Sequence, residues 1–349
     1  MPMTRRDLMI STLAIGAMQA FPSMSQAQAR RFVANCLTGA WEVAFRDNVV
    51  PAFRRDNNDA EVALEPMVSI EQLAKIAASK ANPPPPLDVA ILDNGPSLAA
   101  IAQDLVTPYP VAQSKYYGDI LPEAKSPMGV AAFFQIIGIA YNTDRIKTPP
   151  TSWDDLWKPE YKGRVGVTNL NSSMGTGFMV ALARKHGGSE ANIDEAFKRL
   201  SDLKPNIGAV AANPSQAAAL FQQGQIDIAP AIFNEIMLLK ARDVPVDFVV
   251  PKEWAVGYNS TMHIVKNSPY AELAFKFIEA SLSPEVQTKM MQAPYLVVPT
   301  NSKVEMTGEI ARLFGNVEQL RDRLKFLDWT TINQNRSAWI ERFNREVKL

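Results

Sequence analysis

The sequence predicts an α/β chain with two domains. Short apolar or alternating runs recur along it, and most are followed by turn residues and then by a segment with helical periodicity. This alternation is typical of largely parallel sheets covered by helices. The 349 residues exceed what one hydrophobic core comfortably holds, so we expect two domains rather than one.

The strands and the clearest helices follow from local patterns. Strands are expected at 32–37, 62–68, 87–92, 135–141, 164–168, 226–232 and 246–250. One helix should begin at Ile70 with Ser69 as its cap and end before the four prolines at 83–86, and another should run from Pro214 to Gly224. A third is expected over 329–347, where Trp329, Ile332, Arg336, Trp339, Phe343 and Val347 recur at helical spacing.

The first residues have the layout of an export signal. Arg5 and Arg6 form a twin-arginine pair, an apolar run from Leu8 to Phe21 follows, and small residues end at Ala29. The run is too short to span a bilayer, so we expect a removable signal peptide at 1–29 and a periplasmic protein. The competing interpretation is a chance amphipathic helix.

Charge and cysteine content exclude several classes of protein. After cleavage the chain would carry 34 basic and 35 acidic side chains, which leaves no electrostatic footprint for nucleic acid. Cys36 is the single cysteine, so no internal disulfide can form, and we expect it to be buried in a strand. We predict no cofactor, because metal-binding and nucleotide-binding motifs are missing.

Catalytic constellations are also missing. His186 and His263 are the only histidines; His186 is expected at a helix C-terminus and His263 as a structural residue of a strand. Asp154 and Asp155 are adjacent at a helix start, where carboxylates usually complement the helix dipole. We therefore predict no catalytic residues and no metal ligands, with an exported hydrolase as the competing class.

One loop has the composition of an anion site. Residues 169–177 follow a predicted strand and precede the helical run 178–185, and they carry Ser172, Ser173 and Thr176. Hydroxyl groups and free backbone N–H groups at a helix N-terminus suit a carboxylate, phosphonate or phosphate. Simple capping of the helix by Ser173 or Thr176 is an equally good explanation.

Several segments together resemble one family. Residues 138–144, 150–157 and 159–166, with Val250-Pro251-Lys252-Glu253 and the stretches 271–277 and 282–287, are similar to the extracellular solute-binding proteins of ABC importers, in the polyamine-type branch. The resemblance covers essentially the whole chain after the signal. It implies a type II periplasmic-binding-protein fold, in which each of two lobes is a mostly parallel sheet flanked by helices and the ligand lies in the cleft between them.

The resemblance also implies the domain layout and the partners. Crossover strands are expected near 135–142 and 257–264, which gives lobe 1 as 30–137 and 261–349 and lobe 2 as 138–260. Closure about this hinge would capture a small-molecule solute and present it to an ABC permease in the inner membrane. We expect a monomer with no enzymatic activity and no nucleic-acid partner.

The binding residues should come from loops at strand ends, because open α/β sheets bind ligands there. The predicted ligand-binding residues are Thr38, Trp41, Glu42, Asp93, Asn94, Ser172, Ser173, Thr176, Asn234, Glu235, Tyr258 and Ser260. Trp41 is the best candidate for an apolar wall of the cleft, with a core position as the alternative.

The expected solute differs from a polyamine. The polyamine branch resembles Trp-x-Asp where this chain has Tyr258 and Ser260, and amides and hydroxyls replace an acidic pair at 169–177. We predict a zwitterion or organic anion, such as an amino acid-like or aminophosphonate-like compound, with its anion on the 172–177 loop and an amine near Glu42, Asp93 or Glu235. The alternatives are a polyamine such as putrescine or spermidine, ferric iron at Tyr116-Tyr117, and a receptor domain for a sensor kinase.

Overall fold

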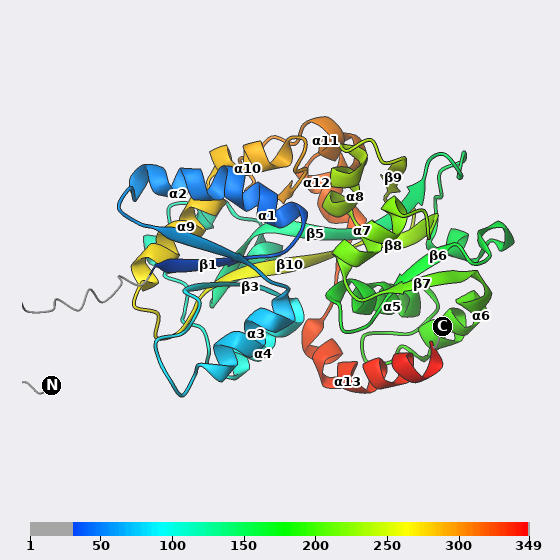
Figure 1. The fold of residues 1–349 in the computed structure, drawn as a ribbon, viewed down its shortest axis with the longest axis horizontal. Helices are drawn as coiled ribbons and strands as arrows, with labels where there is room; N and C mark the ends of the chain where they lie inside the picture. The colour runs from blue at the N-terminus through cyan, green and yellow to red at the C-terminus, as the bar shows by residue number, and fades with distance from the viewer. Residues whose placement is uncertain (1–30, 348–349) are drawn as a thin grey trace, which may run out of the picture. The chain divides into compact units, whose positions relative to one another are not determined.

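The computed structural model describes residues 31–347, so the predicted signal peptide lies outside the described residues. Residues from Arg31 onward form one compact unit with a mixed α/β fold (Figure 1). Its main sheet has the strand order β2-β1-β3-β10-β5-β8-β6-β7. The predicted α/β class is therefore confirmed, and the two ends of this strand order correspond to the two lobes.

The first lobe is built on a parallel three-stranded core in which β1 pairs with both β2 and β3. Its strands are β1 (Phe32–Cys36), β2 (Val62–Pro66) and β3 (Val89–Asp93). Its helices are α1 (Ala40–Ala44), α2 (Val50–Asp56), α3 (Ser69–Ala78) and α4 (Asn94–Ala102), with a π-helical turn at Phe45–Val49 between the first two. Cys36 is buried as predicted, and burial raises the pKa of its thiol to about 12.

The second lobe repeats this plan, because β6 pairs in parallel with both β7 and β8. Its strands are β6 (Val165–Thr168), β7 (Ile207–Ala211), β8 (Ile228–Ile232) and β9 (Val246–Val249). Its helices are α5 (Ser173–Lys185), α6 (Asp194–Leu203), α7 (Pro214–Gln222) and α8 (Phe233–Lys240).

Two long antiparallel strands connect the lobes. β5 (Gly129–Asn142) is buried along its whole length, and β10 (Ala255–Ile264) runs beside it (Figure 1). β10 also pairs with β3 of the first lobe, whereas the far end of β5 pairs with β8 and β9 of the second. The register of β10 against β5 shifts between Asn259 and Thr261, which leaves Ser260 at a bulge. These strands correspond to the predicted crossovers.

The C-terminal part of the chain wraps around both lobes. It comprises α9 (Ala271–Leu282), α10 (Pro284–Met291), β11 (Val298–Pro299), α11 (Gly308–Phe314), α12 (Val317–Arg323), β12 (Leu324–Phe326) and α13 (Trp329–Glu346). Earlier in the chain, the two-residue strand β4 (Lys125–Ser126) pairs with the start of β5. β11 pairs with β5 and β12 with β10.

The last helix contacts both lobes. Figure 1 shows α13 running along both lobes. Its Asn333 donates from Nδ2 to the carbonyl oxygen of Gly95 at 3.0 Å, and its Arg342 forms an ion pair with Asp194 of α6. Trp329 and Trp339 are buried, as the helical spacing predicted. The lobe boundaries at 137/138 and 260/261 stay a prediction, and these contacts place α13 against the segments assigned to both.

Two local predictions need correction, and one strand was missed. Ser69 does not cap α3: the N-cap is Val68, and the Ser69 hydroxyl instead accepts a hydrogen bond from the backbone N–H of Asp93 at 2.8 Å. Helix α5 begins at Ser173, five residues before Phe178, because Gly175 lets it start directly against the end of β6, where a Cβ would lie 2.4 Å from the carbonyl oxygens of Thr168 and Asn169. Strand β7 was not predicted, because its five small and apolar residues show no clear alternation.

Candidate functional site

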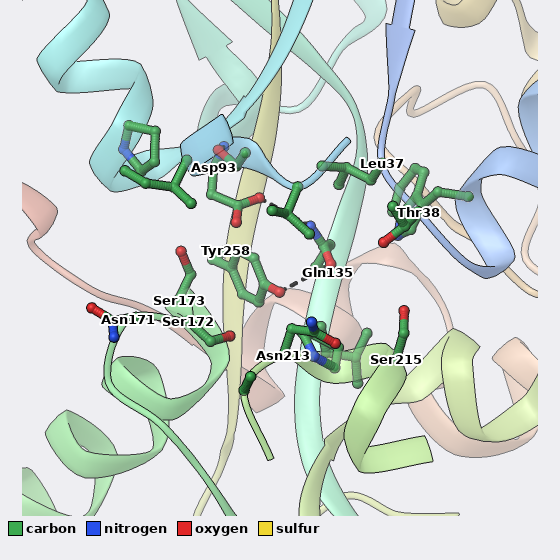
Figure 2. A pocket seen from close by; sticks show the side chains of 18 of the residues that line it. Leu37, Thr38, Asp93, Gln135, Asn171, Ser172, Ser173, Asn213, Ser215 and Tyr258 are labelled. Atoms are coloured by element: carbon green, nitrogen blue, oxygen red, sulfur yellow. Dashed lines mark hydrogen bonds between the residues drawn. The ribbon is translucent and has the colours of Figure 1, made fainter. Parts of the chain in front are cut away.

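A pocket lies where the parallel strands of both lobes end. Its wall follows the carboxyl ends of β1, β2 and β3 on one side and of β6, β7 and β8 on the other, and β5 and β10 contribute Gln135 and Tyr258 (Figure 2). Because each parallel strand leads into a helix, α3, α4, α5, α7 and α8 all begin at this pocket. Their N-termini turn unpaired backbone N–H groups and the positive ends of their dipoles toward one place, which favours a negative charge.

The N-terminus of α5 is held in a fixed position. The Ser172 hydroxyl caps the helix by accepting from the Met174 N–H at 3.2 Å, and the Thr176 hydroxyl donates to the carbonyl oxygen of Leu170 at 2.8 Å. Asn171, Ser172 and Ser173 all line the pocket, close to one another at its lower left in Figure 2. The loop therefore offers amide and hydroxyl groups on a rigid backbone.

Arg336 of α13 holds this loop by hydrogen bonds and also lines the pocket. Its Nε donates to the carbonyl oxygen of Leu170 and to Thr176 Oγ1, each at 3.2 Å, and its Nη2 donates to the carbonyl oxygen of Asn171 at 2.8 Å. Its guanidinium also lies 5.6 Å from the ring centroid of Trp329. Burial lowers the pKa of this guanidinium, and Asp93 opposes that shift. Among the pocket residues in the part of the chain that the structure describes, Arg336 is the one Lys or Arg side chain.

Asp93 ends β3 and belongs to a hydrogen-bond network on the crossover strands. Its Oδ1 accepts from the Ser260 hydroxyl at 2.9 Å and from Gln135 Nε2 at 3.2 Å, and the Tyr258 hydroxyl donates to Gln135 Oε1 at 2.9 Å (Figure 2). Burial raises the pKa of Asp93, while hydrogen bonds from Ser260, Ser173 and Gln135 oppose the rise. Because protein donors already satisfy this carboxylate, it is a poor free acceptor for a solute.

Glu235 lies in the first turn of α8, in the opposite lobe from Asp93. The residue is 8% exposed, and its Oε1 accepts one hydrogen bond, from the Ala40 N–H at 3.3 Å. This contact joins α8 to α1 across the lobes. Burial raises the pKa of the Glu235 carboxyl to about 7, against the opposing effects of the Ala40 N–H and of Arg242.

The structure brings seven of the twelve predicted binding residues to the pocket wall. These are Thr38, Trp41, Asp93, Ser172, Ser173, Glu235 and Tyr258. Trp41 is both wall and core: it is 3% exposed, and its ring packs 5.3 Å from that of Phe133, so the two alternatives for this residue do not exclude each other. Solute binding by these residues stays a prediction.

The other five predicted residues are not in the pocket wall, and four of them have partners within the protein. Glu42 forms an ion pair with Arg46 on the surface of α1, Asn94 accepts from the Asn259 N–H at 2.8 Å, Thr176 donates to Leu170, and Ser260 donates to Asp93. Asn234 is buried, and its Nδ2 lacks a partner among the described residues. For Asn234 the reason is helical geometry: neighbouring side chains in the first turn of a helix point in different directions, so Glu235 faces the pocket and Asn234 does not.

Other pocket residues were missed by sequence reasoning. They are Leu37, Val68, Ser69, Ile70, Pro96, Gln135, Asn171, Ala212, Asn213, Pro214, Ser215, Ile232 and Arg336. Asn213 and Ser215 follow β7. Because that strand was not predicted, the loop after it was not considered as part of a binding site. The sequence did contain an indication for Arg336, because this charged residue occupies one of the regularly spaced positions of an otherwise apolar helix face.

The residues considered for other chemistry have structural roles. His263 is fully buried between the Ser97 hydroxyl and the Met128 carbonyl, and burial lowers its pKa to about 4. Asp155 accepts from the backbone N–H groups of Thr151 and Ser152 in a capping box. Asp154 and Glu253 both form ion pairs with Lys185, at 2.6 and 2.5 Å. None of these residues lines the pocket.

The pair considered for iron is also accounted for. The Tyr117 hydroxyl donates to the Ser126 carbonyl at 3.3 Å, and Lys115 lies 4.9 Å from the centroid of the Tyr116 ring. No group of three or more His, Cys, Asp or Glu side chains among residues 31–347 is arranged to hold a metal ion.

Comparison with known proteins decides the family. The sequence pattern of the bacterial extracellular solute-binding proteins matches residues 48–314, which is well over half of the chain. The chain belongs to this family. The predicted family and the prediction of a binding protein rather than an enzyme are therefore confirmed, since the relatives of this solute-binding protein are substrate-binding proteins of transport systems.

Two curated relatives show how the family varies. The spermidine/putrescine-binding periplasmic protein of Escherichia coli strain K12 is 31% identical over 147 residues, 41% of this chain and 40% of that protein. The match thus spans about two fifths of the length of that relative. The gamma-aminobutyric acid-binding protein of Pseudomonas aeruginosa is 25% identical over 297 residues, 79% of each chain.

A solved structure supports the fold over nearly the whole chain. The crystal structure of an ABC transporter protein from Clostridium perfringens is 25% identical, has a TM-score of 0.72, and covers 91% of this chain and all of its own. Two solved periplasmic binding proteins, one of them from Actinobacillus pleuropneumoniae, share the fold with TM-scores of 0.74 and 0.72, so the predicted two-lobe periplasmic-binding-protein fold is confirmed. None of the helices within residues 31–347 has the length and apolar character needed to cross a bilayer. The twin-arginine signal stays a prediction.

Proposed function

We propose that this protein is the periplasmic substrate-binding component of an ABC importer, and that its solute is a small polar organic compound with an acidic group. The solute would bind between the lobes, and closure about β5 and β10 would present the closed form to a membrane permease. Family membership supports the role in transport. The expected monomeric state is part of this proposal.

One observation carries the choice of solute: within residues 31–347, five helix N-termini and one guanidinium, that of Arg336, surround the pocket. A carboxylate or phosphonate placed near Ser172 would accept from the Ser172 hydroxyl and from backbone donors that are already fixed in position, whereas the Ser173 hydroxyl is engaged with Asp93. Each favourable helix terminus contributes about 0.3–1 kcal/mol, and a charge-assisted hydrogen bond to Arg336 adds to this. The pocket is therefore suited to an anion at the end formed by α5 and α13.

A polyamine is the second candidate, because a relative that shares 31% identity over part of its length is a spermidine/putrescine-binding protein. Two acids in the pocket wall, Asp93 and Glu235, are the observation in its favour. Against it, hydrogen bonds within the protein occupy Asp93, and Arg336 would repel a second ammonium group.

Two measurements test the proposal. The first is mass spectrometry of any solute that copurifies with the folded protein, which should identify a compound with an acidic group. The second is a thermal shift panel of γ-aminobutyrate, 2-aminoethylphosphonate and butyrate against putrescine and spermidine. A ligand at 100 times its Kd stabilises the folded state by about 2.7 kcal/mol, which such a panel detects. Stabilisation by the polyamines with no response to the acids would contradict the proposal.

A further inference from the structure

Glu235 is a buried carboxyl that faces the pocket without a counter-charge. It is 8% exposed and lines the pocket, and its one hydrogen bond is the contact of 3.3 Å from the Ala40 N–H. Among residues 31–347, no Lys, Arg or His nitrogen lies within 4.0 Å of its oxygens. Burying a carboxylate without a partner is costly, so such a group normally belongs to an ion pair or holds a proton.

The charged groups on the surrounding elements are engaged elsewhere. On α8 itself, Lys240 forms ion pairs with Asp247 of β9 and Glu309 of α11. Glu42 of α1 is paired with Arg46, and α7 carries no ionisable side chain. The titratable groups that act on Glu235 from a distance are Arg242, after α8, and Tyr258 of β10. Among residues 31–347, Arg242 therefore acts on this carboxyl only from a distance, and no cation lies within ion-pair distance of it.

The backbone beside Glu235 holds the carboxyl in place. Gly39 precedes α1 with φ +77°, and a Cβ there would lie 2.5 Å from Glu235 Oε1. The absence of a side chain lets the carboxyl reach the Ala40 N–H, and the Trp41 ring lies two residues further along the same segment in the pocket wall. An aromatic side chain and a carboxylate in the wall of one pocket are a favourable surrounding for an alkylammonium group.

We propose that Glu235 is the specificity-determining residue of this pocket and that it accepts an alkylammonium group of the solute in exchange for a proton. This inference rests on the proposed function, since it assigns the second pole of the same site. The solute would then be an amino acid-like or aminophosphonate-like zwitterion, with its acid at Arg336 and the α5 N-terminus and its ammonium at Glu235.

The exchange balances in atoms and charge. The O–H bond of the Glu235 carboxyl breaks, its proton leaves to the bulk buffer, and an N–H of the incoming ammonium donates to the resulting carboxylate. The solute brings its own proton, so one proton is released for each protein that was protonated beforehand. Burial raises the pKa of Glu235 to about 7, so about 0.9 proton per binding event should be released at pH 6 and about 0.1 at pH 8.

Isothermal titration calorimetry measures this release directly. The probes are three compounds with the same four-carbon chain: γ-aminobutyrate, butyrate and putrescine. Each is titrated into the wild-type protein at pH 6 and pH 8, in two buffers with different enthalpies of ionisation. We expect γ-aminobutyrate to bind at least tenfold more tightly than butyrate at pH 8, and its binding enthalpy at pH 6 to depend on the buffer.

Two variants complete the design. Glu235→Gln should lose the dependence on buffer and should bind γ-aminobutyrate and butyrate with affinities within about threefold of each other. Glu195→Gln, an exposed acid of α6 that pairs with Lys198, is the matched control and should behave as the wild type. If Glu235→Gln does not fold, the dependence of the wild-type enthalpy on buffer and pH still decides the question.

The outcomes separate the two proposals. If γ-aminobutyrate binds with no proton release at pH 6, the role of Glu235 is wrong and the proposed function stands. If butyrate binds as tightly as γ-aminobutyrate at pH 8, the ammonium pole is likewise overturned. If putrescine alone binds, the proposed acidic solute is wrong as well.

Discussion

The free energy of unfolding of this protein should depend on pH in a way that Glu235→Gln removes. The pKa of the Glu235 carboxyl is about 7 in the folded state, against an ordinary value of 4.5. Between these values the folded state binds more protons than the unfolded state, so this group makes the folded state less stable as pH rises. The difference of about 2.5 pKa units corresponds to about 3 kcal/mol, most of it between pH 5 and pH 8.

Glutamine keeps an acceptor for the Ala40 N–H but does not titrate. The variant should therefore gain about 2 to 3 kcal/mol relative to the wild type between pH 5 and pH 8. The comparison must be between the two proteins, because His263 has the opposite effect. Its pKa is lowered from 6.5 to about 4 by burial, so its contribution to stability is lost as pH falls through this range, and the two slopes partly cancel in the wild type.

Urea denaturation without added solute, at half-unit steps from pH 5 to pH 8, measures the effect. A difference in the free energy of unfolding that is the same at every pH says nothing about the titration of Glu235. Only the change of this difference with pH tests the prediction. Parallel stability profiles of the wild type and Glu235→Gln would refute the reasoning, because they would mean that Glu235 titrates alike in the folded and unfolded chains.

Three further changes have defined outcomes. Arg336→Gln should weaken the binding of γ-aminobutyrate at least tenfold in calorimetry, with Arg336→Lys intermediate; an unchanged affinity would exclude an anion at this guanidinium. Gly39→Ala should lower stability by about 1–3 kcal/mol in urea denaturation, because φ is +77° and the new Cβ meets Glu235; no loss would mean that the carboxyl moves aside freely. Asp227→Asn should cost about 2 kcal/mol by breaking the paired hydrogen bonds from Arg164 at 2.7 and 2.9 Å, whereas the exposed Asp202→Asn should be neutral in the same assay.

The fold followed from the sequence where each residue pattern had one physical meaning. Continuous apolar strands such as 135–141 indicate buried sheet, and the helical spacing of apolar residues over 329–347 indicates a helix, whatever surrounds them. The prediction failed where two meanings compete. Gly175 and Gly177 indicate a loop by composition, yet here they allow α5 to pack closely against β6 and β5.

The site was predictable in part for a similar reason. Loops after predicted strands could be named, so Trp41, Asp93 and Glu235 were found. Side-chain direction within a first turn could not be judged, which is why Glu42, Asn94 and Asn234 were included. Asn213 depended on an unpredicted strand, and Arg336 depended on a contact between positions more than 160 residues apart, between α13 and the loop at Leu170.

The contact between α13 and the loop before α5 has a consequence for biosynthesis. Every pocket residue apart from Arg336 has been translated by the time the ribosome reaches Tyr258. A nascent chain at that stage lacks the part of β10 that pairs with β3, and it also lacks the guanidinium that holds Asn171 in place. Solute binding should therefore require the last helix, and a chain that ends at Phe326 should not bind the solute although it contains every other pocket residue.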